Sequence, residues 1–319
     1  MKKIVCFGGG SALPKAVLAG IKKYPVEITT ITSMVDSGGS TGQLRHDFNV
    51  LPPGDIARHI LALSMAPEWK KRLFAFRCGH EEFAGGHKGH SFANIFIAGL
   101  EHALKDYEKV LEIVHEFMEV KGRCLPATMD NVQLCAKLEN GEIIEGEDEI
   151  DVPKKHDAQL KIKEIFLKPP AKAYQKAVEA VMQADAIIIG PGDLYSSLLP
   201  FFCPQGMKEA MQKTKAKKIF ICPAMTKLGE TNNFTVLDFA REVEKYAGCA
   251  MDFVLYNNNI PAEQDIEAYK KKELSVLEIV RINAGLDKNK FIGADLLALG
   301  NDIVYDPEKV AALIMKLIM

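Results

Sequence analysis

Lys3-Ile-Val-Cys-Phe-Gly-Gly-Gly-Ser11 is a short apolar run that ends in consecutive glycines. Apolar residues then recur with helical spacing over residues 13–23. A strand, a glycine turn and a helix in this order open the nucleotide-binding α/β folds, where the first amides of the helix favour an anion. The motif is not GxGxxG, so a plain tight turn is the alternative. The predicted phosphate loop consists of Gly8, Gly9, Gly10 and Ser11.

The next alternating run, Glu27 to Thr32, predicts a second strand. It leads into residues 33–45, which we interpret as a glycine- and hydroxyl-rich loop, and a helix is predicted to start near Pro52. Glycine lets a ligand approach the amides, and arginine grips phosphate with two parallel hydrogen bonds. A solvated surface loop is the alternative. The expected ligand contacts are Gly38, Gly39 and Ser40, and the candidate catalytic residues are Asp36, which could also hold magnesium, Arg45, Asp55 and Arg58.

Three further apolar runs, at 184–189, 218–222 and 252–256, also read as strands separated by helices. Strands that alternate with helices form parallel βαβ units, so we predict an α/β, Rossmann-like fold with a mainly parallel sheet and helices on both faces. Ligands bind such sheets at the carboxyl ends of the strands. The loops at 8–11, 33–45, 190–197 and 225–231 all follow strands and are expected to converge there.

We predict one domain over residues 1–319, with a helical subdomain at 53–120 inserted after the second strand. A second excursion, at 122–167, is expected to contain strands and a hairpin turn at Asn140-Gly141. The acidic residues 146–157 within it are interpreted as a loop. Beyond the main strands we expect strands at 276–280 and near Ile303, and a terminal helix from Pro307.

Residues 80–90 contain three histidines and two glutamates, which are metal-ligating residue types. Lys88 lies among them, and we favour another interpretation for the end of this segment. His90-Ser91 precedes a predicted helix and is expected to cap it while facing the pocket. His90 and Asn94 are therefore further candidate ligand contacts.

Composition limits the class of protein. Forty basic and 42 acidic residues give a formal net charge of −2, which argues against a general nucleic-acid binder. Seven cysteines without CxxC spacing indicate reduced thiols in a cytoplasmic protein. We find no signal-peptide pattern and no apolar run long enough to cross a membrane, so no membrane partner is expected. A homo-oligomer is left open.

Taken in order, the motifs resemble those of the gluconeogenesis-factor proteins, which belong to the superfamily of the 2-phospho-L-lactate transferase CofD. The resemblance covers nearly the whole chain. It rests on Gly-Gly-Gly-Ser at 8–11, Val-Asp-Ser-Gly-Gly-Ser-Thr-Gly-Gln-Leu-Arg at 35–45, Pro-Pro-Gly-Asp-Ile-Ala-Arg at 52–58, Gly-His-Ser-Phe-Ala-Asn at 89–94, Gly-Pro-Gly-Asp-Leu-Tyr-Ser-Ser at 190–197 and Met-Thr-Lys-Leu-Gly-Glu-Thr at 225–231.

The resemblance implies a regulatory protein that binds a UDP-sugar, typically UDP-N-acetylglucosamine, and acts in carbon metabolism and cell shape. It also implies contacts from the first glycine loop to the nucleotide, and from the 190–197 loop to the diphosphate. Tyr269 falls where the family has a tyrosine that could contact the nucleotide, although one face of an amphipathic helix explains it as well. In the 190–197 loop, the residues that the resemblance implies as diphosphate contacts are Gly190, Gly192, Leu194, Tyr195 and Ser196.

The transferase relatives suggest an alternative function, in which a phospho-acid group moves from a nucleoside diphosphate carrier to a deazaflavin with magnesium. The family's paired aspartates are Asp36-Ser37 here, which removes a carboxylate from such a magnesium site. The family's basic Arg-His pair near the C-terminus is Tyr305-Asp306. An oxidoreductase is disfavoured because GxGxxG and an acidic ribose-binding residue are missing.

Overall fold

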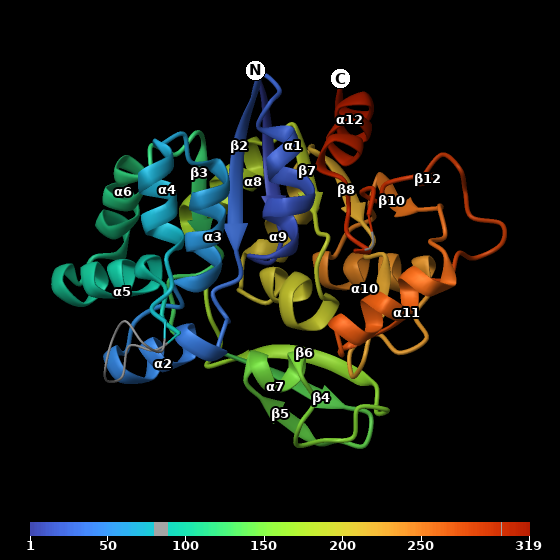
Figure 1. Cartoon of the computed structure of the whole chain (residues 1–319), viewed down its shortest axis with the longest axis horizontal. Coiled ribbons are helices and arrows are strands. Elements are labelled where there is room, and N and C mark those ends of the chain that lie inside the picture. Colours follow the sequence, from blue (N-terminus) through green and yellow to red (C-terminus); the bar gives the residue numbers. More distant parts are fainter. Residues whose placement is uncertain (80–88, 301) are drawn as a thin grey trace.

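A seven-stranded parallel sheet forms the centre of the protein (Figure 1). The structure is a computed structural model that describes residues 1–79, 89–300 and 302–319. The predicted α/β, Rossmann-like fold is confirmed. In spatial order the strands are β3 (Arg123–Pro126), β2 (Val26–Thr32), β1 (Lys2–Phe7), β7 (Ala186–Ile189), β8 (Lys217–Ile221), β10 (Phe253–Asn257) and β12 (Phe291–Ala294).

The strand order reverses between β1 and β7. From β1 the chain moves outward through β2 and β3, and it then returns to place β7 on the other side of β1, with Phe7 opposite Ile189. The loops after β1 and β7 therefore leave the same edge of the sheet in diverging directions. A crevice for a ligand forms at such a reversal.

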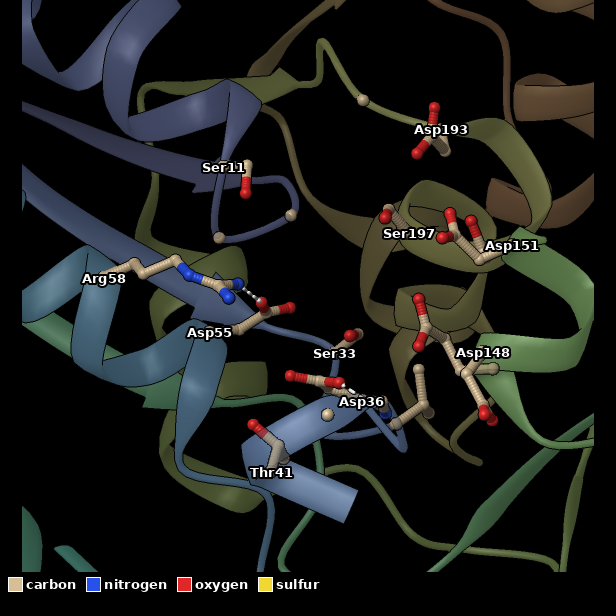
Figure 2. A pocket seen from close by; sticks show the side chains of 18 of the residues that line it. Ser11, Ser33, Asp36, Thr41, Asp55, Arg58, Asp148, Asp151, Asp193 and Ser197 are labelled. Carbon is tan, nitrogen blue, oxygen red and sulfur yellow. Dashed lines mark hydrogen bonds and ion pairs between the residues drawn. The ribbon is translucent and has the colours of Figure 1, made fainter. Parts of the chain in front are cut away.

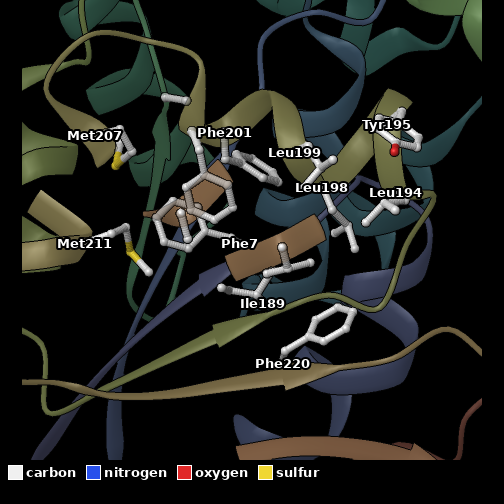
Figure 3. Close-up of a cluster of buried hydrophobic side chains, with 14 of the residues drawn as sticks. Phe7, Ile189, Leu194, Tyr195, Leu198, Leu199, Phe201, Met207, Met211 and Phe220 are labelled. Carbon is white, nitrogen blue, oxygen red and sulfur yellow. The ribbon is translucent and has the colours of Figure 1, made fainter. Parts of the chain in front are cut away.

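Successive side chains of β1 enter different cores because side chains alternate across a strand. Val5 and Phe7 belong to the core under α8 (Gln175–Gln183), α9 (Met207–Lys213) and α10 (Val236–Ala247). Phe7 lies there against Phe201 of the short helix η3 (Leu199–Phe202), with a ring-centroid distance of 5.3 Å (Figure 3). The opposite face packs under η1 (Pro14–Leu18), α1 (Ala19–Ile21), α3 (Gly54–Leu63), α6 (Tyr107–Phe117) and α12 (Pro307–Ile318).

A helical insertion follows β2, as predicted, but it starts earlier than expected. Residues 33–45 were predicted to be a loop, whereas α2 (Gly39–Phe48) already begins within them. Gly42 allows this, because a Cβ there would lie 2.0 Å from the carbonyl oxygen of Ser37 and the loop could not fold onto the helix. The insertion continues with α3, α4 (Glu68–Ala75), α5 (Phe92–Leu104) and α6.

Between β3 and β7 the chain forms a small antiparallel sheet of β4 (Gln133–Leu138), β5 (Ile143–Glu145) and β6 (Ile162–Lys168). The expected turn at Asn140-Gly141 joins β4 to β5. The interpretation of residues 146–157 as a loop was wrong in part, because they contain the short helix α7 (Glu147–Asp151). We call residues 131–168, which include the two residues leading into β4, the β4–β6 lobe. It lies beneath the carboxyl end of the central sheet (Figure 1).

The C-terminal third differs from the prediction in three ways. Strand β12 was missed, and Ile303 lies outside any strand, with only an isolated bridge between Leu297 and Tyr305 nearby. Residues 225–231 are not all loop, because β9 (Met225–Lys227) pairs with β11 (Val276–Ile279) outside the main sheet. Helix α11 (Glu263–Lys272) precedes β11. Among the described residues, no helix has the length and apolar character to cross a membrane.

Candidate functional site

A pocket of about 450 Å³ lies at the reversal between β1 and β7 (Figure 2). Its walls come from the loops after β1, β2 and β7, the start of α3, and α7 of the β4–β6 lobe. Of the four loops predicted to converge, those at 8–11, 33–45 and 190–197 line the pocket, whereas the segment at 225–231 does not line it and contacts the loop after β7 through Lys227 and Glu230. The predicted site residues that line the pocket are Gly9, Gly10, Ser11, Asp36, Gly38, Gly39, Ser40, Asp55, Arg58, Asn94, Gly192 and Ser196.

Arg45 was predicted to clamp a phosphate, but its guanidinium is already used inside the protein. It is buried and donates hydrogen bonds to the carbonyl oxygens of Asp36 (2.9 Å) and Val132 and to Oδ1 of Asn131 (2.9 Å). Arg45 does not line the pocket. Its role is to tie the loop after β2 to the β4–β6 lobe.

The loop after β7 was expected to contact the diphosphate, but its amides at Tyr195 and Ser196 do not face the pocket. Residues Leu194–Leu198 form a single turn of π-helix, η2, in which Leu194 and Tyr195 are buried. A carboxylate oxygen of Glu230 accepts hydrogen bonds from the amides of Tyr195 (2.7 Å) and Ser196 (3.1 Å). Glu230 is itself buried and also accepts from the Ser196 hydroxyl (2.7 Å). The position predicted for a phosphate is thus filled by the protein's own carboxylate.

Other predicted contacts support the pocket from behind. His90 Nδ1 lies 2.7 Å from the hydroxyl of Ser40, to which the Asn94 side chain donates at 3.0 Å. Ser91 caps α5, as predicted, by accepting from the Asn94 amide. Of the remaining predicted residues, Gly8 and Gly190 do not line the pocket, and Tyr269 of α11 is partly buried against the core that contains α12.

The pocket glycines bring chain segments close together. A Cβ on Gly10 would lie 2.4 Å from Oδ1 of Asp55 and 2.9 Å from its Cα, which is closer than a methyl group can approach. A Cβ on Gly9 would lie 3.1 Å from the hydroxyl of Ser197. At Gly192 it would meet the flexible side chain of Leu198 at 3.2 Å. Gly10 is therefore the least replaceable of the three.

Asp36 and Asp55 form an acidic pair in the pocket. Burial, followed by the nearby charge of Asp55, raises the pKa of Asp36 to about 6, although the Gly38 amide donates to its carboxylate at 3.0 Å. Burial also raises the pKa of Asp55, against the effect of Arg58, whose guanidinium lies 2.9 Å from it. Placing two carboxyls close together disfavours charging both, and a cation would relieve that cost.

Helix α7 adds acidic residues that the sequence analysis missed. Glu147, Asp148 and Asp151 all line the pocket. Asp148 accepts a hydrogen bond from the Ser37 hydroxyl at 2.6 Å, and its amide donates back to the same hydroxyl at 3.1 Å. A carboxylate from another element thus lies beside Ser37, within hydrogen-bonding distance of its hydroxyl. Four acids within residues 147–151 were the signal that could have identified this helix.

We expect Glu147→Gln to stabilise the protein at alkaline pH. Burial and the charge of Asp36 raise the pKa of Glu147 to about 9, whereas an unfolded glutamate titrates near about 4.3. Between these values the folded state binds the extra proton, so wild-type stability falls as pH rises. The glutamine variant loses this dependence, which amounts to about 4 kcal/mol over these three pH units. Its melting temperature should therefore exceed that of the wild type by about 6 °C more at pH 8 than at pH 5.

The matched control is Glu142→Gln on the exposed hairpin of the same lobe. Thermal melts of the three proteins at both pH values decide the matter. A difference between Glu147→Gln and wild type that is the same at pH 5 and pH 8 would show that Glu147 ionises normally.

A second acidic group contains two residues of the pocket wall, Asp151 and Asp193, and the buried Glu230 behind them. Oxygens of Asp151, Asp193 and Glu230 all lie within 4.8 Å of one another and could hold a metal ion. The buried ammonium of Lys227 already pairs with all three, lying 2.7 Å from Asp193 and 3.4 Å from Glu230. Burial lowers the pKa of Lys227, but the three carboxylates outweigh that effect and hold it above the ordinary value. The positive charge of Lys227 therefore balances these carboxylates in the place where a metal ion could otherwise bind.

The segment at 80–90, whose residue types could ligate a metal, lies mostly outside the described part of the chain. His80, Glu81, Glu82 and His87 lie outside the described residues, and only His90 of that segment's histidines is placed.

Comparisons with known proteins agree with the fold and the loops. The family of the 2-phospho-L-lactate transferase CofD matches residues 4–296. The putative gluconeogenesis factor of Thermotoga maritima is 38% identical over 278 residues, which are 87% of this chain and 85% of that protein. The gluconeogenesis factor of Bacillus subtilis is 32% identical over 326 residues, 99% of this chain and 98% of that protein.

A solved structure supports the same conclusion. The crystal structure of a UPF0052 family protein from Bacillus halodurans superposes with a TM-score of 0.89 at 31% identity, covering 99% of this chain and 100% of that one. With these matches over most of its length, the chain belongs to the CofD family and, within it, to the gluconeogenesis factors.

Proposed function

We propose that this protein binds a nucleoside diphosphate sugar of the uridine type in the pocket between β1 and β7. In this proposal it acts as a regulatory protein in carbon metabolism and cell shape. The observation that carries the proposal is the place of the pocket at the reversal of strand order, where Gly9, Gly10 and Gly192 line it. Nucleotides bind α/β sheets at such reversals.

The diphosphate is best accommodated at the side of the pocket that contains arginines. Arg58 and Arg77 both line it, and guanidinium groups bind phosphate oxygens in pairs. The carboxylate of Glu230 already accepts the hydrogen bonds of the amides at the start of η2. The loop after β7 therefore offers the ligand its glycine and serine residues instead of these amides. Ser11, Ser196 and Ser197 supply further hydroxyl groups.

The residues of the pocket fit a magnesium ion bound with the nucleotide. Magnesium keeps several waters and needs only one or two carboxylates in addition to ligand phosphates. Asp36 would hold it, with Asp55 as the second carboxylate. Burial raises the pKa of both, and the charge of Asp55 raises that of Asp36 further, a cost that a divalent cation would relieve. When bound, the ion would neutralise charge on the diphosphate.

The first test of this proposal is thermal stabilisation by nucleotides. A ligand that binds only the folded protein should add about 2.7 kcal/mol of stability at 100 times its dissociation constant. We expect UDP-sugars with magnesium to raise the melting temperature, and inorganic phosphate at equal concentration to serve as the control. Unchanged melting with every UDP- and GDP-linked compound at millimolar concentration would exclude nucleotide binding.

The second candidate is a transferase of the CofD kind. The match to that family over residues 4–296 and the position of Asp36 in the pocket favour it. Catalysis of this type depends on charge neutralisation at the leaving diphosphate, for which only Asp36 remains of the family's aspartate pair.

We expect Asp36→Asn to alter ligand affinity, with no turnover to lose. The protein is incubated with magnesium and UDP- or GDP-linked compounds, with and without a deazaflavin acceptor, and products are followed by mass spectrometry. Asp47→Asn, on the exposed side of α2, is the control. Multiple turnovers that Asp36→Asn abolishes and Asp47→Asn retains would establish the transferase.

A further inference from the structure

We propose that the acidic wall of the pocket selects a neutral, hydroxyl-rich sugar and excludes a sugar that carries a carboxylate. We define the acidic wall as Asp148, Asp151 and Asp193. This inference rests on the proposed function and specifies which nucleotide sugars the site accepts.

The charges of the pocket are separated in space. Figure 2 shows Arg58 on one side, beside Asp55, and the three aspartates of the acidic wall together on the other side. Arg77 belongs with Arg58, because both also line a smaller cavity of about 140 Å³ between α3, α4 and α5. A ligand that places its diphosphate at the arginines therefore directs its sugar toward the acidic wall.

The acidic wall is held in place from behind. Lys227 pairs with Asp151 and Asp193, and its charge is shared with the buried Glu230. Ser37 fixes Asp148 with two hydrogen bonds, of 2.6 Å and 3.1 Å. The acidic wall keeps an excess of negative charge after these contacts. The single ammonium of Lys227 faces the three carboxylates of Asp151, Asp193 and Glu230, and the Ser37 hydroxyl beside Asp148 carries no charge. Its oxygens are positioned without any contribution from a ligand.

Carboxylates at fixed positions discriminate between hydroxyl and carboxylate groups. A sugar hydroxyl donates a hydrogen bond to a carboxylate, and such a charge-assisted bond is stronger than a neutral one. A second carboxylate is an acceptor only, and its charge is repelled by the wall, which should weaken binding by at least about tenfold, or about 1.4 kcal/mol. Specificity of this kind depends on the repulsive element as much as on the attractive one.

The test compares UDP-glucose with UDP-glucuronate, which differ only in the oxidation of one hydroxymethyl group to a carboxylate. Affinities are measured by isothermal titration in buffer with EDTA, so that no divalent cation bridges the carboxylates. For the wild type we expect UDP-glucuronate to bind at least about tenfold more weakly. In Asp148→Asn/Asp193→Asn the gap should shrink to about threefold or less, because asparagine keeps an acceptor and can also donate.

Glu164→Gln is the matched control, since Glu164 is an exposed acid of the same lobe that does not line this pocket. It should keep the wild-type gap. Should the double variant unfold, Asp148→Asn alone supplies the comparison, because it keeps all three contacts of Lys227. Equal wild-type affinities for the two sugars, or a gap that the asparagine variants leave unchanged, would overturn the inference alone. Failure of UDP and both sugars to bind in EDTA and also with magnesium would overturn the proposed function, and the inference with it.

Discussion

Gly10→Ala should weaken binding of the nucleotide ligand by about 100-fold or more, a loss of about 2.7 kcal/mol. The added methyl group would lie 2.4 Å from Oδ1 of Asp55 and 2.9 Å from its Cα. Backbone atoms cannot move aside as a flexible side chain can, so the loop after β1 and the start of α3 must separate. That movement carries Asp55 and Arg58 out of the positions that define the pocket.

Isothermal titration with a UDP-sugar and magnesium measures this effect, with circular dichroism to verify the fold. Gly99→Ala is the matched control, because Gly99 lies in α5 and a Cβ there meets nothing within 4 Å. Alanine favours a helix, so this control should bind like the wild type and be at least as stable. Wild-type affinity in Gly10→Ala would show that the ligand does not depend on the loop after β1.

Arg45→Met should lower the free energy of unfolding by about 3 kcal/mol, which corresponds to about 5 °C in melting temperature for a chain of this length. Methionine fills part of the space but donates no hydrogen bond. The carbonyl oxygen of Val132 then loses its donor in a buried place, and the carbonyl oxygen of Asp36 and the side-chain oxygen of Asn131 lose theirs in partly buried ones. Buried polar groups without partners are among the few causes of large destabilisation.

Urea unfolding of Arg45→Met and of Arg72→Met gives the comparison, because Arg72 is exposed on α4. The exposed variant should change stability by less than about 0.5 kcal/mol. A similar small change for Arg45→Met would mean that the loop after β2 and the β4–β6 lobe are held together by other contacts.

The interpretation of Arg45 shows what sequence reasoning can miss. The sequence of a glycine-rich loop with an arginine is the same whether the arginine binds a phosphate or the protein's own carbonyl oxygens. The difference depends on Val132, which is 87 residues away, and on the fold of the β4–β6 lobe. The same applies to Tyr195 and Ser196, whose amides face Glu230, 35 and 34 residues further along the chain.

The sequence alone determined the features that depend on neighbours in the chain. Apolar runs marked the central strands β1, β2, β7, β8 and β10, and their alternation with helices required a parallel sheet. The cap at Ser91 and the turn at Asn140-Gly141 depend on local hydrogen bonds, so they too were predicted. The convergence of loops at one edge followed from the sheet, which is why most predicted site residues line the pocket.

The tertiary structure decided the rest, because those features depend on packing and charge between distant segments. Helix α2 forms from glycine- and hydroxyl-rich residues only because the loop after β2 packs onto Gly42. Helix α7 brings acids into the pocket through Ser37, 111 residues away from Asp148. Residue type shows that a carboxylate is present, whereas its partner decides whether it binds a ligand, caps a helix or neutralises a lysine. That partner is fixed only when the chain folds.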